Sequence, residues 1–477
     1  MIIKGYVFGA LYGAACLLLA LVAYKLGMSK KHSRKLVHIL VGAEWIILYH
    51  YMGATYHFLI VCVAFLVLLT LSHFMKLMPM ISSDEDNAPG TIYYAVAMSV
   101  MATVCLFVPN MMFPFGIGVM CTSLGDGFAG VVGQSIKAHN PKIYGKKTLF
   151  GSLANFIFSS GAAIAFKYIF DMELKIWQCL LIGLFSVGLE LITVFGLDNI
   201  AITLGTAFLS YAFINLPLIN NFVIPIVATP FVIALVLEKR VLTKGGLALA
   251  LILDAVVSLT LANFGFVLLI SFLVFSVVVD KIKEHKKLTD TITKKGDCRD
   301  AVQVVANGLV PMIMAILFSI TFNKIFVVGY IAALAEALAD TVASGVGVYS
   351  RSTFDVFKMR KATRGISGGM SLIGTGFSLI GALVISAIAL AFGAIDLKLM
   401  LVVTLAAFLG AVFDSFLGSV FQIKYTCSVC NQITERTEHC GKPTVKHSGF
   451  EFFDNDVVNL FGGAFAAVVA IIFTIVV

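Results

Sequence analysis

The chain has 477 residues, of which 60% are hydrophobic and only 13% are charged. Soluble domains carry about a quarter of charged residues, so this composition excludes an ordinary soluble enzyme. It also excludes a disordered chain, which needs low hydrophobicity. Lys and Arg total 34 against 26 Asp and Glu, a formal charge of +8. We expect no nucleic-acid partner, because the basic residues lie in short loops between apolar runs, as in membrane proteins.

Apolar runs of about 17–25 residues, long enough to cross a ~30 Å hydrocarbon core, recur along the chain. They predict an all-α polytopic membrane protein with about sixteen transmembrane helices. Their centres lie near residues 15, 43, 66, 99, 124, 159, 186, 207, 230, 254, 272, 310, 335, 380, 411 and 467.

The charges flanking the first run, residues 5–25, predict its orientation. Lys4 alone precedes it, whereas five basic residues follow it between positions 25 and 35. We therefore expect an uncleaved helix with its N-terminus outside. Alternation then places nearly all strongly charged loops in the cytoplasm, including 137–147, 351–364 and 424–456. We expect the plasma membrane of a prokaryote, with functional sites facing the cytoplasm.

Two parts of the sequence repeat one another. Counted from an aspartate, the matched pairs are Asp126 and Asp340, then Gly133 and Gly347 seven residues on, Lys147 and Lys361 twenty-one on, and Gly151 and Gly365 twenty-five on. The series predicts two related halves in the same membrane orientation. The alternative is that glycines and basic loops look alike in all membrane proteins.

Four acids fall within apolar runs, where charges are costly and are functional candidates by default. They are Asp126, Glu190, Asp340 and Asp414. Each lies near the cytoplasmic end of its helix, so exposure to water is the alternative. Gly127 and Gly130 follow Asp126 and would allow close approach of a ligand or of another helix.

A basic loop follows each of the two aspartate helices. The first contains Lys146 and Lys147, the second Lys361 and Arg364, and each leads into a glycine-containing helix start. A helix N-terminus with nearby lysines binds anions, although positive loops are also ordinary cytoplasmic topology. Carboxylates beside such a pocket suit a Mg²⁺–nucleotide, because Mg²⁺ takes one or two carboxylates plus phosphate oxygens. The sequence has no Walker A motif.

The last cytoplasmic loop contains Cys427-x2-Cys430, followed by His439, Cys440 and His447. A reducing compartment disfavours a disulfide, whereas two cysteines at this spacing are typical of a structural zinc site. The fourth ligand stays open between His439 and Cys440, because adjacent residues are awkward to use together. Cysteines that bind no metal are the alternative.

The first half resembles the phytol kinase and dolichol kinase family, which is related to the CTP-using phosphatidate cytidylyltransferases. The resemblance covers about residues 1–235. The motifs that carry it are Arg34-Lys35-Leu36-Val37-His38, Gly90-Thr91-Ile92-Tyr93-Tyr94, Gly125-Asp126-Gly127, Gly145-Lys146-Lys147-Thr148-Leu149-Phe150-Gly151-Ser152 and Asp198-Asn199.

The second half, about residues 240–477, resembles another membrane family, the one that contains plant phytyl-phosphate kinase. Its motifs here are Arg299-x3-Gln303-Val304-x2-Asn307-Gly308, Ala339-Asp340-Thr341-x2-Ser344, Gly365-x2-Gly368-Gly369, Asp414-Ser415-x2-Gly418 and Asn455-Asp456-x2-Asn459. The family's ADTxxSE pattern has Gly345 in place of its glutamate.

Together the two resemblances imply a bifunctional isoprenoid salvage kinase. Residues 1–237 would form a phytol/dolichol kinase-like domain that phosphorylates a prenyl alcohol, and residues 238–477 a phytyl-phosphate kinase-like domain that adds the second phosphate. The expected co-substrate is CTP or another nucleoside triphosphate with Mg²⁺, and the lipid alcohol would enter from the bilayer. We also allow for a homodimer. A CTP-dependent lipid cytidylyltransferase and a lipid or isoprenoid transporter are the alternatives.

Phosphoryl transfer depends on positioning and charge neutralisation, which assigns expected roles to the motif residues. The candidate catalytic carboxylates are Asp126, Asp198, Asp340, Asp414 and Asp456. The candidate nucleotide- or phosphate-binding residues are Arg34, Lys35, His38, Lys146, Lys147, Arg299, Lys361 and Arg364. The candidate substrate-positioning residues are Asn199, Gln303, Asn307, Asn455 and Asn459. The candidate zinc ligands are Cys427, Cys430, His439 and Cys440.

Overall fold

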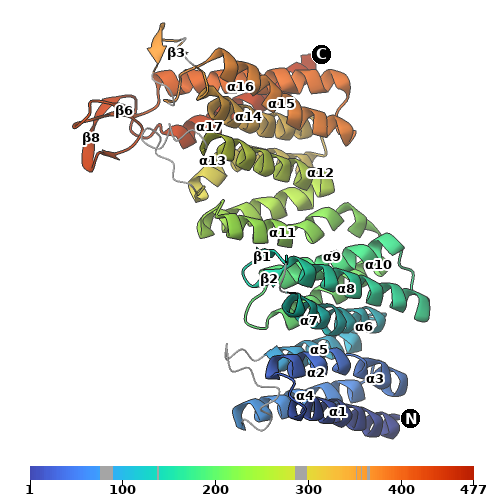
Figure 1. The fold of residues 1–477 in the computed structure, drawn as a ribbon. Coiled ribbons are helices and arrows are strands. Elements are labelled where there is room, and N and C mark those ends of the chain that lie inside the picture. The colour runs from blue at the N-terminus through green and yellow to red at the C-terminus, as the bar shows by residue number, and fades with distance from the viewer. Residues whose placement is uncertain are drawn as a thin grey trace. The chain divides into compact units, whose positions relative to one another are not determined.

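The computed structural model describes residues 1–75, 90–136, 139–284, 298–350, 352–355, 357–362 and 366–476. Helices make up most of the described chain, which confirms the expected all-α class. The chain divides into two compact units, Met1–Glu238 and Lys239–Val477, and Figure 1 shows their elements along the sequence. The kinase-like identity of each unit stays a prediction.

The first unit is a helical bundle with one small hairpin, β1–β2, outside the apolar helices. Its elements in order are α1 Ile2–Lys25, α2 Lys30–Val41, α3 Glu44–Met52, α4 Tyr56–Met75, α5 Gly90–Phe107, α6 Met112–Met120, the π-helix η1 Cys121–Asp126, α7 Gly127–Ser135, β1 Lys142–Tyr144, β2 Lys147–Thr148, α8 Leu149–Ile169, α9 Ile176–Ile192, α10 Asp198–Asn215, η2 Pro217–Asn221 and α11 Val223–Lys239.

The second unit repeats the plan of helices and a hairpin, and adds a four-stranded sheet before its last helix. Its elements are α12 Lys244–Glu284, α13 Ala301–Thr321, α14 Ile325–Gly347, β3 Thr353–Asp355, β4 Arg360–Ala362, α15 Leu372–Ala391, α16 Leu397–Val420, β5 Lys424–Cys427, β6 Ile433–Thr434, β7 Glu438–His439, β8 Lys442–Ser448 and α17 Asn455–Val476.

Eleven helices within the described ranges are long and apolar enough to cross a membrane. One of them, α12, bends at Ala262 (φ 54°) and covers the two expected segments centred at 254 and 272. The segment expected near 43 is instead two short helices, α2 and α3, interrupted at Gly42 and Ala43. The polytopic class is therefore confirmed, while the count of sixteen and the parallel orientation of the halves stay predictions.

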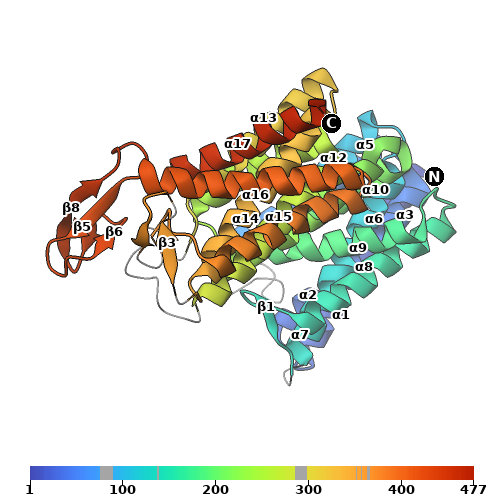
Figure 2. The same cartoon turned by 90° about the horizontal axis from the view of Figure 1, so that it is seen from above.

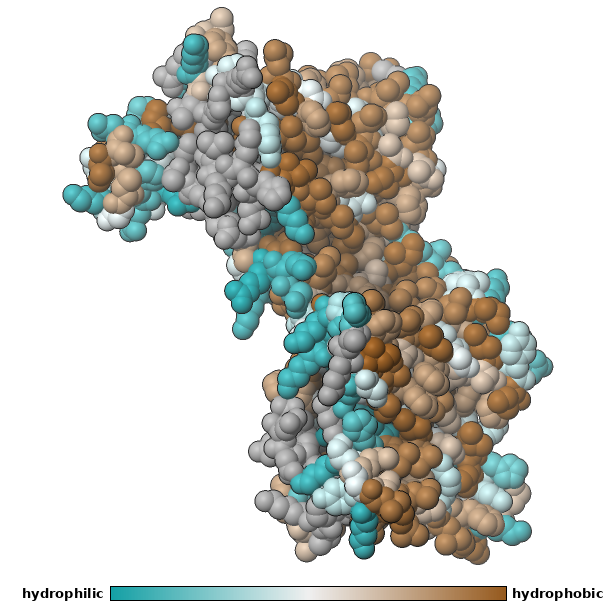
Figure 3. Space-filling view, viewed as in Figure 1, coloured by the Kyte–Doolittle hydropathy of each residue, from teal (hydrophilic) through white to brown (hydrophobic). Residues whose placement is uncertain are grey.

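Each unit has its own apolar core. In the first unit, the fully buried Trp45 of α3 packs among aromatic rings of α6 and α8, including Phe115 and Phe166. In the second, α14 is enclosed by α12, α13, α15, α16 and α17. Hydrophobic side chains cover most of the helical surface drawn in Figure 3, as lipid contact requires.

A similar glycine contact joins two helices in each unit. In the first, a Cβ added at Gly133 of α7 would lie 3.5 Å from the Cα of Gly151. Gly151 follows Thr148, the N-cap residue of α8, by three positions. In the second, a Cβ on Gly374 would lie 3.3 Å from the Cα of Gly347, and Gly374 follows Ser371 at the start of α15 by the same spacing. Gly365, which the sequence pairs with Gly151, lies outside the described residues, and the contact that Gly151 makes in the first unit is made in the second by Gly374.

The four-stranded sheet, which we call the Cys/His ribbon (residues 424–448), projects beyond the end of α16 in Figure 2. Its strand order is β6-β5-β8-β7, with all neighbours antiparallel. The loop expected at residues 424–456 is thus an ordered β-structure that joins α16 to α17.

Candidate active site

Asp126 lies where a membrane helix widens. The helix that begins at Met112 passes through the π-helical segment Cys121–Asp126 before it continues as α7. A π-bulge is rare and is often found at functional sites. The Asp126 side chain is only 6% exposed, so its charge requires partners from neighbouring helices.

Helix α2 supplies those partners. An added Cβ at Gly127 would overlap Ile39, and one at Gly130 would press on Lys35, so the two glycines allow α2 to approach closely. Lys35 Nζ donates to Asp126 Oδ2 at 2.7 Å and to the Asp126 carbonyl at 3.1 Å. The glycines after Asp126 therefore serve helix packing.

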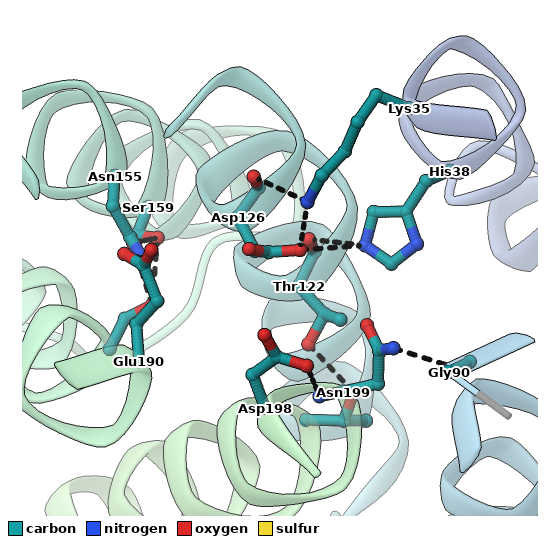
Figure 4. Close-up of polar contacts among 12 residues, drawn as sticks. Lys35, His38, Gly90, Thr122, Asp126, Asn155, Ser159, Glu190, Asp198 and Asn199 are labelled. Carbon is teal, nitrogen blue, oxygen red and sulfur yellow. Dashed lines mark hydrogen bonds and ion pairs between the residues drawn. The ribbon is translucent and has the colours of Figure 1, made fainter. Parts of the chain in front are cut away.

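His38, one turn after Lys35, approaches the same carboxylate oxygen of Asp126 (Figure 4). Its Nε2 is 2.9 Å from the Thr122 carbonyl oxygen and 3.5 Å from Asp126 Oδ2. An N–H on Nε2 would donate to the Thr122 carbonyl, which orients the ring. Lys35 and His38, expected to bind nucleotide or phosphate, thus both lie beside Asp126.

Lys147 lies between two further carboxylates. It leaves β2 and reaches Glu190 Oε1 at 3.0 Å and Asp198 Oδ2 at 3.6 Å. Burial opposes its charge, but Glu190, Asp126 and Asp198 together raise the pKa of Lys147 above its usual value. The lysine therefore stays protonated at neutral pH and carries a fixed positive charge into the site.

Glu190 is anchored by a buried polar network that the sequence motifs did not reveal. Asn155 Nδ2 donates to Glu190 Oε2 at 2.7 Å, and the Asn155 amide oxygen accepts from Ser159 and Ser186, each at 2.8 Å. These residues lie on α8 and α9 (Figure 4). The sequence signal for this network is polar residues four positions apart within apolar segments, Asn155 with Ser159 and Ser186 with Glu190.

Asp198 and Asn199 begin α10. Asn199 Nδ2 donates to the Gly90 carbonyl at 2.8 Å and so ties α10 to the start of α5. Its Oδ1 is buried and accepts no hydrogen bond from any described residue. An orphaned amide oxygen beside a carboxylate offers an additional oxygen ligand for a hard cation.

A cavity of about 280 Å³ opens onto these groups. One end is charged and includes Arg34, Lys35 and Asp126. The remaining wall is largely apolar, and its residues come from α1, α3, α4 and α5: Gly13, Cys16, Leu17, Leu48, Val61, Cys62, Phe65, Leu69, Ala95 and Met98. The cavity thus combines a charged end with a largely apolar wall.

Two residues of the first unit stand outside the expected pattern. Glu44, which the motifs did not single out, lines the cavity at 5% exposure, and its Oε1 has no hydrogen-bond partner among the described residues. Lys146, an expected phosphate ligand, is exposed in the hairpin. Within this hairpin Lys147 is therefore the better-placed cation.

The second unit gathers acids around α14. Glu336 and Asp340 lie one turn apart on α14, and Glu336 interacts electrostatically with Asp340 and with Asp414 of α16. Glu336 is 2% exposed, and its Oε1 finds no hydrogen-bond donor in the described ranges. The motifs missed Glu336, although an acid in an apolar run four residues before Asp340 was a visible signal.

Glycines make room for this acid cluster. A Cβ at Gly462 of α17 would lie 2.7 Å from Glu336 Oε1, and one at Gly410 of α16 would lie 2.6 Å from the Glu336 stem. Gly345, where the family pattern has glutamate, instead packs on Val279 of α12, and an added Cβ would overlap that side chain. A carboxylate at position 345 therefore has no space in this chain.

The other residues expected in the second site are more dispersed. Arg299 pairs with Asp280 at 2.6 Å and donates to Ser276, both on α12. Lys361 is exposed in β4, and Arg364 lies outside the described residues. The neighbours Gln303 and Asn307 bond within α13, where Asn307 Nδ2 donates to the Gln303 carbonyl at 3.0 Å.

At the start of α17, Asn455 Nδ2 donates to Asn459 Oδ1 at 3.3 Å, and the Asp456 N–H donates to Asp454 at 3.1 Å. These contacts are local to the helix start and cap it. They do not test the expected roles of Asn455, Asp456 and Asn459 toward a substrate.

The candidate metal ligands of the Cys/His ribbon do converge. Ligand atoms of Cys427, Cys430, His439 and Cys440 all lie within 4.8 Å of one another. His447 faces elsewhere, with its Nδ1 3.0 Å from Thr426 Oγ1. His439 and Cys440 thus both point to one centre despite being adjacent.

Comparison with known proteins agrees with this membrane architecture. The family of integral membrane proteins designated DUF92 matches residues 227–467, about half of the chain. The chain belongs to the DUF92 family. The matched range includes α14, the acid cluster and the Cys/His ribbon.

Three curated proteins are similar to the chain. An uncharacterised membrane protein of Methanocaldococcus jannaschii is 33% identical over 33% of this chain and 65% of its own length. The chloroplastic protein VTE6 of Arabidopsis thaliana is 23% identical over 53% of this chain and 69% of its own. A phytol kinase of Synechocystis is 27% identical over 43% of this chain and 88% of its own. No solved structure matches the chain.

Proposed function

We propose that the protein is a membrane kinase that phosphorylates a prenyl alcohol, such as phytol or geranylgeraniol, and then phosphorylates the resulting monophosphate. The first unit would perform the first step and the second unit the second step. The similarity to a phytol kinase supports the reaction class. The observation that carries the proposal is the cavity whose charged end meets a largely apolar wall.

The cavity suits a long amphiphile. A prenyl chain would lie against α1, α4 and α5, and its hydroxyl would reach the charged end beside Asp126 and Lys35. Burial of an apolar chain contributes about 25 cal/mol per Å², so the tail supplies most of the affinity and the charged end selects the head group. A kinase that acts on a small polar substrate would not need an apolar wall of this kind.

In the proposed reaction, the alcohol oxygen forms a bond to the γ-phosphorus of a nucleoside triphosphate. The bond from that phosphorus to its bridging oxygen breaks, and the nucleoside diphosphate leaves. The hydroxyl proton passes to the neutral imidazole of His38 or to water, while Asp126, paired with Lys35, stays a carboxylate that positions Lys35 and His38. Lys35, Lys147 and Arg34 would neutralise the charge on the moving phosphoryl group, where such reactions need most help.

The residues of the first unit fit a Mg²⁺–nucleotide. Asp198 and the orphaned Oδ1 of Asn199 are oxygen donors on the cavity wall, and Mg²⁺ binds few protein oxygens together with phosphates. Held by these residues, a cation would supply positive charge against the phosphate oxygens. In the second unit, Glu336, Asp340 and Asp414 would take the equivalent role.

The positive-inside rule supports a cytoplasmic side for these sites, because basic loops flank them, and nucleotides are present in the cytoplasm. The nearest rival activity, a CTP-dependent lipid cytidylyltransferase, would use a similar nucleotide site and release pyrophosphate. A transporter is the rival of another class, and would move labelled prenyl alcohol across proteoliposomes without nucleotide.

The test uses purified protein in lipid with Mg²⁺, geranylgeraniol and either CTP, UTP or ATP. We expect a nucleoside diphosphate as co-product, and prenyl monophosphate followed by diphosphate in mass spectra. Release of pyrophosphate with a nucleotidyl-lipid product would instead identify the cytidylyltransferase. Uptake without any phosphorylated product would support the transporter.

A further inference from the structure

The Cys/His ribbon brings four soft ligands together from two hairpin tips. Cys427 ends β5 and Cys430 lies in the turn to β6, while His439 ends β7 and Cys440 begins the turn to β8. Cys440 has φ 53°, so the chain reverses there and directs two adjacent side chains to one point. This reversal is why neighbouring residues both reach the centre.

The distances suit a tetrahedral ion. His439 Nδ1 is 3.5 Å from Cys430 Sγ and 3.3 Å from Cys440 Sγ. Zinc bonds of about 2.3 Å to sulfur and about 2.0 Å to nitrogen give ligand separations of about 3.5–3.8 Å. The Val429 N–H also approaches Cys427 Sγ at 3.4 Å, and such a donor stabilises a thiolate ligand.

Residues at the base of the same ribbon form hydrogen bonds with a turn of the second unit that contains Ser367. Glu435 Oε1 accepts from the Ser367 N–H at 3.0 Å, and Lys424 Nζ donates to the Ser367 carbonyl at 2.8 Å. Both ribbon residues are only 8% exposed. The peptide groups on both sides of Ser367 are therefore held by charged side chains, which form stronger hydrogen bonds than neutral ones.

That turn, residues 366–369, lies against the end of α16. An added Cβ at Gly418 would lie 3.0 Å from the Gly368 nitrogen, and Gly368 itself has φ 87°. Gly418 is one helical turn beyond Asp414. The turn thus connects the ribbon to the helix that carries one of the clustered acids.

We propose that Cys427, Cys430, His439 and Cys440 bind one structural Zn²⁺, and that the metal-folded ribbon positions the 366–369 turn beside α16. Three thiolates and one imidazole close the coordination shell, so the ion is structural and does not bind substrate. Metal binding supplies the folding free energy of a sheet too small to be stable alone. The metal site does not depend on the proposed kinase function, whereas any effect of the turn on catalysis rests on that function.

The metal site is tested directly on full-length protein purified without chelators. We expect about one zinc per chain, and replacement by Co²⁺ should give thiolate-to-cobalt absorption. Cys427→Ser with Cys430→Ser should lose both signals. Cys298→Ser, in the same unit but outside the cluster, should keep them. Absence of metal from the wild type, with no cobalt absorption, would overturn the site.

The positioning role is tested by hydrogen exchange at the Ser367 amide. We expect exchange about tenfold faster in Glu435→Ala, the loss from one charged hydrogen bond, with zinc retained. The double cysteine variant should also expose Ser367, whereas Glu451→Ala, which changes an exposed ribbon-flanking acid, should not. Unchanged protection of Ser367 in zinc-free protein would overturn the positioning role, whether or not any kinase activity is found.

Discussion

Lys147 supplies the positive charge that balances two carboxylates of the first site, because it contacts both Glu190 and Asp198. We expect Lys147→Gln to lower the rate of alcohol phosphorylation about 100-fold, since it removes a preorganised charge from the transferring phosphoryl group. Lys142→Gln, which changes an exposed lysine of the same hairpin, is the matched control for initial-rate assays.

Loss of folding is separated from loss of catalysis by a second change. Lys147→Gln leaves Glu190 buried without its countercharge, which is destabilising. Adding Glu190→Gln to Lys147→Gln should return the unfolding temperature to that of the wild type but should not restore activity. If the double variant recovered activity as well, Lys147 would have only a structural role.

Glu336 is the corresponding test residue in the second unit. Glu336→Gln removes a buried charge that interacts with Asp414 and Asp340, so we expect unchanged or higher thermal stability. If the acids hold Mg²⁺, phosphorylation of prenyl monophosphate should need about tenfold more Mg²⁺. Titration of Mg²⁺ in the two partial reactions measures this, with alcohol phosphorylation as the internal control. An unaltered Mg²⁺ requirement in both reactions would exclude Glu336 from metal binding.

Helix α5 tests the assignment of the apolar wall. Ala95 is 3% exposed and lines the cavity, while Val100 on the same helix is 42% exposed and does not. Ala95→Phe should fill part of the chain-binding space and raise the KM for a C20 alcohol about tenfold, with shorter prenyl alcohols less affected. Val100→Phe should leave chain-length preference unchanged, and equal effects of both substitutions would contradict the assignment.

Hydrophobic run length predicted the membrane class and the position of nearly every helix, because spanning length is a physical requirement. It did not predict the break at Gly42 and Ala43, where the chain lies close against η1: a Cβ on Gly42 would overlap Ser123. A sequence with no spatial partners cannot reveal such a contact.

The candidate site was partly predictable for a similar reason. The motifs singled out Asp126, Lys35 and His38, and the structure brings them together. It missed Asn155 and Glu336, since each is defined by a neighbour from another helix. The ungapped repeat paired Gly151 with Gly365, which lies outside the described residues, and it did not single out Gly374, whose contact with Gly347 resembles that of Gly151 with Gly133.

Two compact units, each with a helix that carries a repeat-matched aspartate (Asp126 or Asp340), fit the proposal of two separable reactions in one chain. Each unit pairs that helix with a following hairpin and a glycine contact, yet their acids differ. Position 122 of the first unit is Thr122, whereas the position equivalent by helix register in the second is Glu336. An extra carboxylate suits a substrate that already bears a phosphate, since such a substrate brings more charge for cations to balance.

Product analysis of two single variants tests the two-step account most directly. Wild type, Asp126→Asn and Asp340→Asn would be supplied with Mg²⁺, CTP and either geranylgeraniol or its monophosphate, and products resolved by mass spectrometry. Loss of a positioning carboxylate should slow its own step at least about 100-fold. Asp126→Asn should therefore make no monophosphate yet convert added monophosphate to diphosphate, and Asp340→Asn should accumulate monophosphate. Loss of both steps in either folded variant would contradict independent sites in the two units.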